Sequence, residues 1–331
     1  MSRFVGFGTA LPDHQLSPAV SLSALSQIWP HLRSAGREAV TRYTVQSVDR
    51  VFSTQSLGAR MRVYREEAPR LAQLAVEEAL SDAGLRADQI DFVLAVSCTG
   101  YLVPSLDVYL ANALGFRSDA IRIPLTELGC AGGGAALAAA DRHLRLEPRH
   151  RVLVVCVELC SLTFQPEDNS VDNMTAAMVF GDGAAAAVLT GDPGGLELVA
   201  TGTRLIPETD HLLGFDLRDD GFHPVLDRRL PRLIEHELAG ALAGFGEGRL
   251  DFVAVHAGGP RIFDAVESGL GLQPGALVES RSSFASYGNL SSASLLFVLA
   301  QLRGGSPGTG LGLAFGPGVT VEMASLRRSP E

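Results

Sequence analysis

The chain has 331 residues, of which 46% are hydrophobic and 19% charged, so its composition is that of a globular protein and not of a disordered one. The formal net charge is -10 and no block of five like charges occurs, which argues against non-specific binding to nucleic acid. No apolar run approaches the ~20 residues of a membrane span, and the apolar run at the start is too short for a signal peptide. We therefore expect a cytoplasmic protein with neither a nucleic-acid nor a membrane partner.

Short apolar runs and segments with helical spacing alternate along the chain. The runs expected to form strands are residues 4–9, 92–97, 121–125, 151–160 and 184–189. Helical spacing favours helices over residues 66–83 and 104–114, whereas residues 18–65 are polar and are expected to be irregular. This alternation predicts an α/β fold with buried sheets.

Cysteine usage indicates a reducing compartment. The chain has four cysteines, all in apolar surroundings: Cys98, Cys130, Cys156 and Cys160. No group of Cys and His has the spacing of a zinc site, so we expect free thiols and no metal.

The segment around Cys130 predicts a reactive thiol. Residues 127–141, ELGCAGGGAALAAAD, indicate a tight turn followed by a helix made almost wholly of Ala and Gly. A helix that is small on every side is expected to be buried, with neighbouring backbones packed close to it. Cys130 then lies at the helix start, where unpaired N–H groups favour an anion and lower a thiol pKa. A buried structural cysteine explains the same segment, so this motif alone leaves both interpretations open.

The second half of the chain repeats the first. The IDFV motif that begins at Ile90 returns as LDFV at Leu250, and the turn at Cys130 returns at Asn289, at offsets of 160 and 159 residues. Such a long period predicts two copies of a whole subdomain, in a chain too long for one simple core. We place the halves at residues 1–193, which carry the nucleophilic Cys, and 194–331, which carry the His and Asn.

The repeat makes Cys130 and Asn289 equivalent, each at the start of a central helix, and His256 ends a strand at a Gly-rich turn. These are the parts of a nucleophilic acyl-transfer site. His256 can stabilise the thiolate as an ion pair, and together with Asn289 it can donate hydrogen bonds to an enolate. Backbone N–H groups of Cys130 and of residues 314–318, including Gly316, are candidates for a second oxyanion hole. Taken singly, His256 and Asn289 are explained as well by a core histidine and a helix N-cap.

Together the motifs resemble those of type III polyketide synthases, the chalcone-synthase-like branch of the thiolase superfamily. They extend from about residue 66 to residue 326 and include VSCTGY from Val96, GCAGG from Gly129, VFGDG from Val179, VHAGGP from Val255, YGNLSSA from Tyr287 and FGPGVTVE from Phe315. This resemblance implies a thiolase-like αβαβα five-layer fold built from two duplicated halves, and a homodimer.

The resemblance also implies roles for individual residues. It places the catalytic triad on Cys130, His256 and Asn289, and two gatekeeper phenylalanines on Phe180 and Phe222. The further residues expected to bind substrate are Cys98, Thr99, Thr163 and Gly316. Val103 matches a loop position that reaches into the cavity of the partner subunit.

The implied function is that of a condensing enzyme without a bound cofactor. An acyl group is transferred to Cys130 and undergoes decarboxylative Claisen condensation with a malonyl thioester, followed by cyclisation. The expected substrates are thioesters of coenzyme A or of carrier-protein phosphopantetheine, which makes an acyl carrier protein a possible partner. One alternative is a single-step enzyme like ketoacyl carrier-protein synthase III, or a pyrone-forming ketosynthase that uses carrier-bound chains. Another is a non-catalytic partner subunit, against which the intact triad argues.

Two departures from the family pattern affect the expected site. Ala257 follows the catalytic His where the family usually has Pro. The segment of residues 51–60 is shorter than in relatives, where this region covers the tunnel mouth and supplies basic residues for the coenzyme A phosphates. The remaining candidates for those contacts are Arg33, Arg37, Arg42, Arg60, Arg62 and Arg65, for which a solvated basic face is an equally good interpretation.

Overall fold

The computed structural model describes residues 2–30, 40–245 and 249–329. Its helices are α1 (Pro18–Ile28), α2 (Val48–Val51), α3 (Leu57–Ala83), α4 (Leu106–Leu114), α5 (Gly132–Leu146), α6 (Val171–Val179), α7 (Leu230–Ala241), α8 (Pro260–Gly269), α9 (Val278–Tyr287) and α10 (Ser294–Leu302). Its strands are β1 (Ser2–Ala10), β2 (His14–Leu16), β3 (Arg42–Thr44), β4 (Phe92–Val96), β5 (Ile121–Leu125), β6 (Arg151–Leu159), β7 (Asp182–Thr190), β8 (Leu196–Leu205), β9 (Leu213–Arg218), β10 (Gly221–Leu226), β11 (Phe252–Val255), β12 (Gly308–Gly316) and β13 (Thr320–Arg328). Short 3₁₀ turns include η3 (Gly129–Ala131), η4 (Cys160–Thr163), η5 (Ser291–Ala293) and η6 (Pro317–Val319).

Within the described residues, nine strands form one sheet in the order β11-β12-β13-β8-β1-β7-β6-β4-β5. On one side, β4 is parallel to β6, β6 is antiparallel to β7, and β7 is antiparallel to β1. On the other side, β11, β12, β13 and β8 repeat the same sequence of orientations. The halves meet where β1 pairs with β8 through Ser2↔Leu198 and Arg3↔Glu197. The duplication expected from the sequence is therefore present in the strand order.

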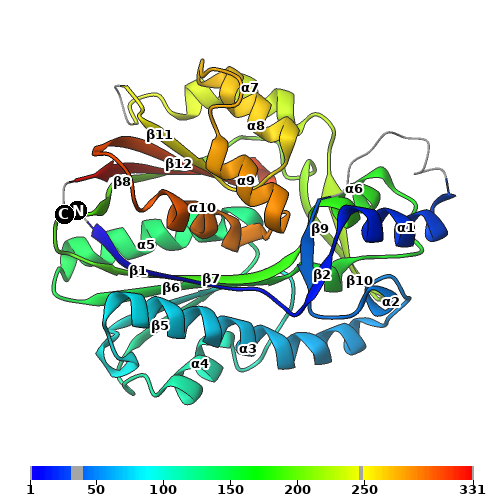
Figure 1. Cartoon of the computed structure of the whole chain (residues 1–331), viewed down its shortest axis with the longest axis horizontal. Helices are drawn as coiled ribbons and strands as arrows, with labels where there is room; N and C mark the ends of the chain where they lie inside the picture. The colour runs from blue at the N-terminus through cyan, green and yellow to red at the C-terminus, as the bar shows by residue number, and fades with distance from the viewer. Residues whose placement is uncertain (1, 31–39, 246–248, 330–331) are drawn as a thin grey trace.

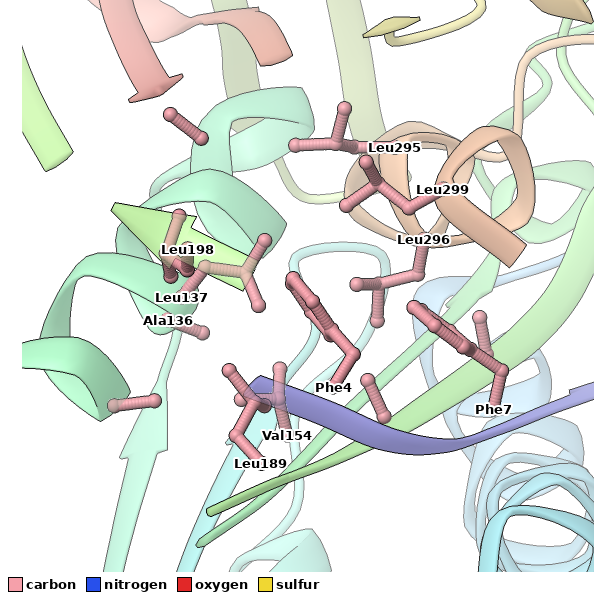
Figure 2. Close-up of a cluster of buried hydrophobic side chains, with 14 of the residues drawn as sticks. Phe4, Phe7, Ala136, Leu137, Val154, Leu189, Leu198, Leu295, Leu296 and Leu299 are labelled. Atoms are coloured by element: carbon pink, nitrogen blue, oxygen red, sulfur yellow. The ribbon is translucent and has the colours of Figure 1, made fainter. Parts of the chain in front are cut away.

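The two half-sheets enclose a central layer of helices (Figure 1). Helices α5 and α10 lie between the half-sheets, α3 and α4 cover the outside of the first, and α7 and α8 lie outside the second. The five layers are those of the expected αβαβα architecture. Apolar side chains from β1, α5 and α10, including Phe4, Leu137 and Leu296, point toward one another in the space between the half-sheets (Figure 2).

The small residues of α5 allow the central elements to approach closely. A Cβ atom on Gly133 would lie 2.3 Å from the backbone oxygen of Ser292, and one on Gly134 would lie 2.6 Å from Cβ of Glu322. Real Cβ atoms do not tolerate such distances, because the packing there is already at contact. The expected buried, close-packed helix is thus confirmed, and it brings η3 next to η5.

The structure corrects the register of the repeat around Cys130. Gly129 and Ser291 have φ angles of 52° and 48°, and each opens a 3₁₀ turn that leads directly into a central helix. The counterpart of Cys130 is therefore Ser292, and the expected equivalence of Cys130 and Asn289 is wrong. That expectation aligned Gly129 with Gly288. In the structure, the residue with a left-handed φ that begins each turn is Gly129 in the first half and Ser291 in the second. Asn289 precedes its turn by two residues and forms a bridge with Phe180.

The expected strands agree closely with the structure, but the described residues of the segment 18–65, namely 18–30 and 40–65, are not irregular. They contain α1, α2 and β3, and α3 begins at Leu57 and not near residue 66. Local caps account for two of these starts, because Ser17 accepts a hydrogen bond from the N–H of Val20, and Ser56 one from that of Ala59. The polar composition of this segment predicted an irregular structure. The prediction was wrong because contacts with segments distant in the sequence hold these helices in place. The proposed division of the chain between residues 193 and 194 stays a prediction.

Candidate active site

Two of the three catalytic candidates lie together at the starts of the two central helices, and the third lies at the end of a strand. Cys130 lies in η3, two residues before α5 begins, and Asn289 precedes η5. His256 follows β11, where its backbone N–H donates to the oxygen of Leu313 (2.9 Å). Strand ends and helix starts thus supply the catalytic candidates, as in other α/β sites.

Cys130 lies beside a hydroxyl group from η5 and an amide group from the residues just before it. Its Sγ lies 3.5 Å from Ser291 Oγ and 4.0 Å from Asn289 Oδ1. Burial raises the pKa of the Cys130 thiol to about 11, and the hydrogen bonds with Ser291 and Asn289 oppose this shift. The expected net lowering of the thiol pKa at a helix start is therefore wrong for the resting site. Desolvation of the charged form outweighs the nearby donors.

The side-chain amide of Asn289 is held by hydrogen bonds to its oxygen. Its Oδ1 accepts from the backbone N–H of Ser291 (2.8 Å) and from Ser294 Oγ (3.3 Å). The carbonyl side of the amide is thereby occupied, which leaves the Nδ2 hydrogens free to donate. The side chain is 3% exposed, so this orientation is held inside the protein.

His256 is a neutral donor in this structure. Its Nδ1 accepts a hydrogen bond from the backbone N–H of Phe315 (3.3 Å), which places the imidazole proton on Nε2. Burial lowers the pKa of His256 to about 4, so the ring is neutral at pH 7. The expected ion pair between imidazolium and thiolate is not favoured, because burial disfavours both charges. Ala257 is fully buried in the following turn, where the N–H of Gly258 donates to the oxygen of His256 (2.6 Å).

A cavity opens in front of Cys130. Every expected pocket residue except one lines it: Cys98, Thr99, Thr163, Phe180 and Gly316. The exception is Phe222, whose ring packs edge-to-face on Phe215 at 5.7 Å between centroids, and Phe215 lines the cavity in its place. Among the described residues of the expected triad, only Cys130 lines this cavity. His256 is bonded to the backbone N–H of Phe315, the residue before Gly316, which does line it.

Two buried residues of the site were missed by the sequence analysis. Ser291 lies 3.5 Å from both Cys98 Sγ and Cys130 Sγ. Glu158 accepts hydrogen bonds from Thr99 Oγ1 (2.8 Å), Ser292 Oγ (2.5 Å) and the backbone N–H of Cys98 (3.1 Å). Burial raises the pKa of Glu158, and these donors oppose the shift. A charged residue inside the apolar run of β6 was the sequence signal that could have found it.

The arginines suggested for coenzyme A binding occupy different environments. Arg42 and Arg60 are buried and donate to backbone carbonyls, Arg60 Nη1 to the oxygen of Leu162 (2.8 Å), so a solvated basic face is wrong for both. Arg62 and Arg65 are exposed on α3. Arg33 and Arg37 lie outside the described residues.

The family models for chalcone and stilbene synthases match nearly the whole chain. The model of the N-terminal domain matches residues 44–193, and that of the C-terminal domain matches residues 197–330. The chain belongs to this family. The synthase is 40% identical over 295 residues to 1,3,6,8-tetrahydroxynaphthalene synthase of Streptomyces coelicolor, covering 86% of this chain and 79% of that one. It is 33% identical over 304 residues to phloroglucinol synthase of Pseudomonas fluorescens, covering 88% and 86%.

Solved structures of type III polyketide synthases share the fold. The synthase superposes on 1,3,6,8-tetrahydroxynaphthalene synthase from Streptomyces coelicolor with a TM-score of 0.92 and 35% identity, over 99% of each chain. The type III polyketide synthase domain of Steely1 from Dictyostelium gives a TM-score of 0.90 and 27% identity, again over 99% of each chain. These similarities confirm the thiolase-like fold and the predicted polyketide synthase function. The single-step alternative is not favoured.

None of the described helices combines the length and the apolarity needed to cross a bilayer.

Proposed function

We propose that this synthase elongates and cyclises a polyketide on Cys130, using malonyl-CoA as the extender. The thiol attacks an acyl-CoA carbonyl, the acyl group passes to Sγ, and coenzyme A leaves with the proton. Malonyl-CoA then loses its carboxylate as carbon dioxide, and the electron pair of the broken carbon–carbon bond forms an enolate. The enolate carbon attacks the acyl carbonyl and displaces the Cys130 thiolate. The chain, two carbons longer, is now a coenzyme A thioester that can return to Cys130.

One observation carries the assignment of the other two catalytic residues. Backbone N–H groups occupy the acceptor atoms of both, Ser291 N–H on Asn289 Oδ1 and Phe315 N–H on His256 Nδ1. The hydrogen-bonding atoms that remain, Asn289 Nδ2 and His256 Nε2, are both N–H donors. Fixed donors stabilise a negative oxygen as it develops and need no reorganisation during the reaction. We assign them to the enolate oxygen of the decarboxylated extender.

The names of the relatives support a cyclised aromatic product. They include synthases of 1,3,6,8-tetrahydroxynaphthalene and of phloroglucinol. The apolar walls of the cavity around Phe180 and Phe215 would keep water from the enolate, which protons quench. We propose coenzyme A thioesters as the donors and no requirement for a carrier protein.

The substitution Asn289→Asp should separate the two half-reactions. The carboxylate would keep an oxygen for the Ser291 N–H but lose the Nδ2 donors, so enolate stabilisation should fall. Release of carbon dioxide from malonyl-CoA, without carrier protein, is expected to slow on the order of 100- to 1000-fold, the usual cost of one oxyanion donor. Formation of the acyl adduct on Cys130, followed by intact-protein mass spectrometry, should change far less. Equal loss of both activities would refute this assignment, and Asn289→Ala provides a variant without a new charge.

We propose that the synthase is a homodimer. Its two subunits would contact each other through the loop of residues 101–105 and the edge strand β5. Tyr101 and Val103 are each 68% exposed, and Ile121 and Ile123 are 45% and 43% exposed. Exposed apolar residues clustered on one edge are typical of an interface, and obligate dimers bury upwards of ~2,000 Å². Sedimentation at low micromolar concentration should show a dimer. A single species near the monomer mass of 34.9 kDa would exclude it, together with the role of Val103 in the neighbouring cavity.

A further inference from the structure

One wall of the active-site cavity is the hairpin formed by β9 and β10. In the part of the chain that the structure describes, these strands pair with each other and lie outside the nine-stranded sheet. One face of the hairpin carries apolar side chains that oppose one another in pairs: Leu213 and Leu226, Phe215 and Pro224, Leu217 and Phe222. The first two pairs line the cavity that Cys130 also lines. The position of the hairpin therefore sets the width of the cavity.

The opposite face of the hairpin carries a buried histidine among charged residues. The side chain of His223 is only 7% exposed. Its Nδ1 lies 3.0 Å from Asp168 Oδ2, and its Nε2 lies 3.0 Å from Asp220 Oδ1. Arg218 Nη1 lies 3.4 Å from the same Nδ1, and Arg218 Nε donates to Asp216 (2.7 Å). His223 is thus held between two carboxyl groups, one of them from outside the hairpin.

These contacts indicate that the ring of His223 is protonated. Burial opposes the ionisation of Asp168, but its hydrogen bonds with His223 and Ser170 outweigh burial and keep its pKa below the usual value. The hydrogen bond from His223 likewise lowers the pKa of Asp220. An ionised carboxylate only accepts hydrogen bonds, so each ring nitrogen that bonds to one must carry a proton. His223 is therefore an imidazolium, with an ion pair to each aspartate.

The pair with Asp168 is the one that can hold the hairpin in place. Asp220 lies in the turn of the hairpin itself and its side chain is 62% exposed, whereas that of Asp168 is 20% exposed. Water weakens an exposed ion pair much more than a buried one. The His223–Asp168 pair is also the one that joins two different segments of the chain.

Residues 165–172, which lead into α6, contact β10 at three positions. Gln165 Nε2 donates to the backbone oxygen of Phe222 (3.1 Å), and the backbone N–H of Leu226 donates to Asp172 Oδ2 (2.9 Å). The ion pair lies between these two bonds along β10. Side chains from one segment thus attach this wall of the cavity to the rest of the subunit.

We propose that His223 is a positioning residue for the reaction. Its imidazolium, bonded to Asp168, holds the hairpin at the distance from Cys130 that fixes the number of extensions. The inference rests on the proposed function, because the chain grows in the cavity that the hairpin closes. His223 does not line this cavity, so it acts through the wall and not on the substrate. Without the ion pair, Phe215 on the other face of the hairpin would move, and the cavity would lose its fixed width.

Hydrogen exchange of backbone amides tests whether the ion pair holds the hairpin. His223→Gln and Asp168→Asn each remove the ion pair and keep a polar side chain. The matched control is Asp216→Asn, because Asp216 lies on the same face of the hairpin but bonds to Arg218 of its own strand. Exchange over residues 213–226 should be about tenfold faster in the first two variants, the usual effect of losing a charged hydrogen bond. Exchange in the rest of the chain, and in Asp216→Asn, should be unchanged.

Product analysis tests whether the ion pair serves the reaction. With malonyl-CoA, His223→Gln and Asp168→Asn should spread the products over several chain lengths and lower kcat for the main product several-fold at unchanged KM. Acetylation of Cys130 by acetyl-CoA should keep the wild-type rate, because η3 and η5 hold the thiol. The double variant should lose no more than either single variant, since both remove the same pair. Asp216→Asn should resemble the wild type.

Two results would overturn the proposal, even if His223→Gln failed to fold. Unchanged exchange in Asp168→Asn would show that the ion pair does not hold the hairpin. Faster exchange with unchanged products would show that the position of the wall does not set the chain length. If the wild type formed neither an acyl adduct nor carbon dioxide, the proposed function would fall, and hydrogen exchange would still decide whether His223 holds the hairpin.

Discussion

Replacing Cys130 with alanine will abolish acyl loading and polyketide formation while leaving the protein folded. The sulfur is the only nucleophile that lies against both Ser291 and Asn289 among the described residues, and the covalent steps pass through it. Loss of the nucleophile in comparable acyl-transfer enzymes costs on the order of 10⁴-fold or more in rate. The polar neighbours of Sγ lie at the distances of weak hydrogen bonds. Removing the sulfur therefore leaves no strongly bonded polar group without a partner, and the free energy of unfolding should change little.

The matched control for this variant is Cys98→Ala. Cys98 lines the same cavity and shares the Ser291 hydroxyl, but the proposed reaction forms no bond to it. Intact-protein mass spectrometry after incubation with acetyl-CoA should show an acyl adduct in the wild type and in Cys98→Ala, and none in Cys130→Ala. An adduct in Cys130→Ala would place the nucleophile elsewhere. If the wild type formed no adduct with any donor, the alternative that this protein is a non-catalytic partner subunit would be favoured.

Replacing Gly133 with alanine will destabilise the protein and inactivate it. The added Cβ would lie 2.3 Å from the backbone oxygen of Ser292, which cannot rotate away as a side chain would. Overpacking of a tight core typically costs about 1–3 kcal/mol, and a clash with backbone belongs at the upper end of that range. Relief of the clash requires α5 and η5 to separate, which would also displace Cys130 from Ser291 and Asn289.

Gly240→Ala is the control for helix propensity. Gly240 is exposed in α7, and a Cβ there would meet no atom within 4 Å. Because alanine favours a helix by up to ~1 kcal/mol over glycine, this variant should be as stable as the wild type or slightly more stable. Urea unfolding of both variants provides the comparison. A free energy of unfolding in Gly133→Ala equal to that of the wild type would show that the central helices can move apart without cost.

The candidate nucleophile and the layered architecture were predictable because their signals are local. The Ala- and Gly-rich helix after Cys130 is too small on every side to be anything but buried, and the apolar runs of β4, β6 and β7 have the length of buried strands. The repeat of these features at one offset indicated the duplicated halves. Each of these conclusions depends on residues that are neighbours in the sequence.

The structure decided which residues face Cys130, because that depends on backbone geometry. The left-handed φ of Ser291 sets the turn that brings its hydroxyl to Cys130 and moves the counterpart of Cys130 to Ser292. Sequence spacing carries no record of such a φ angle at a serine. The pKa shifts of Cys130 and His256 were likewise undeterminable from the sequence, because their main cause is burial by distant segments.

The sequence by itself determined the family, the duplication of the two halves and the three catalytic candidates, because these rest on residue identity and on order along the chain. Only the tertiary structure decided that Phe215 and not Phe222 lines the cavity, that Glu158 lies beneath Cys98 and Thr99, and that Arg42 turns inward. The physical reason is the same in each case. A side chain's neighbours across a half-sheet or a hairpin are set by packing between segments that lie far apart in sequence, and a polar or aromatic residue does not reveal from its own identity which way it points.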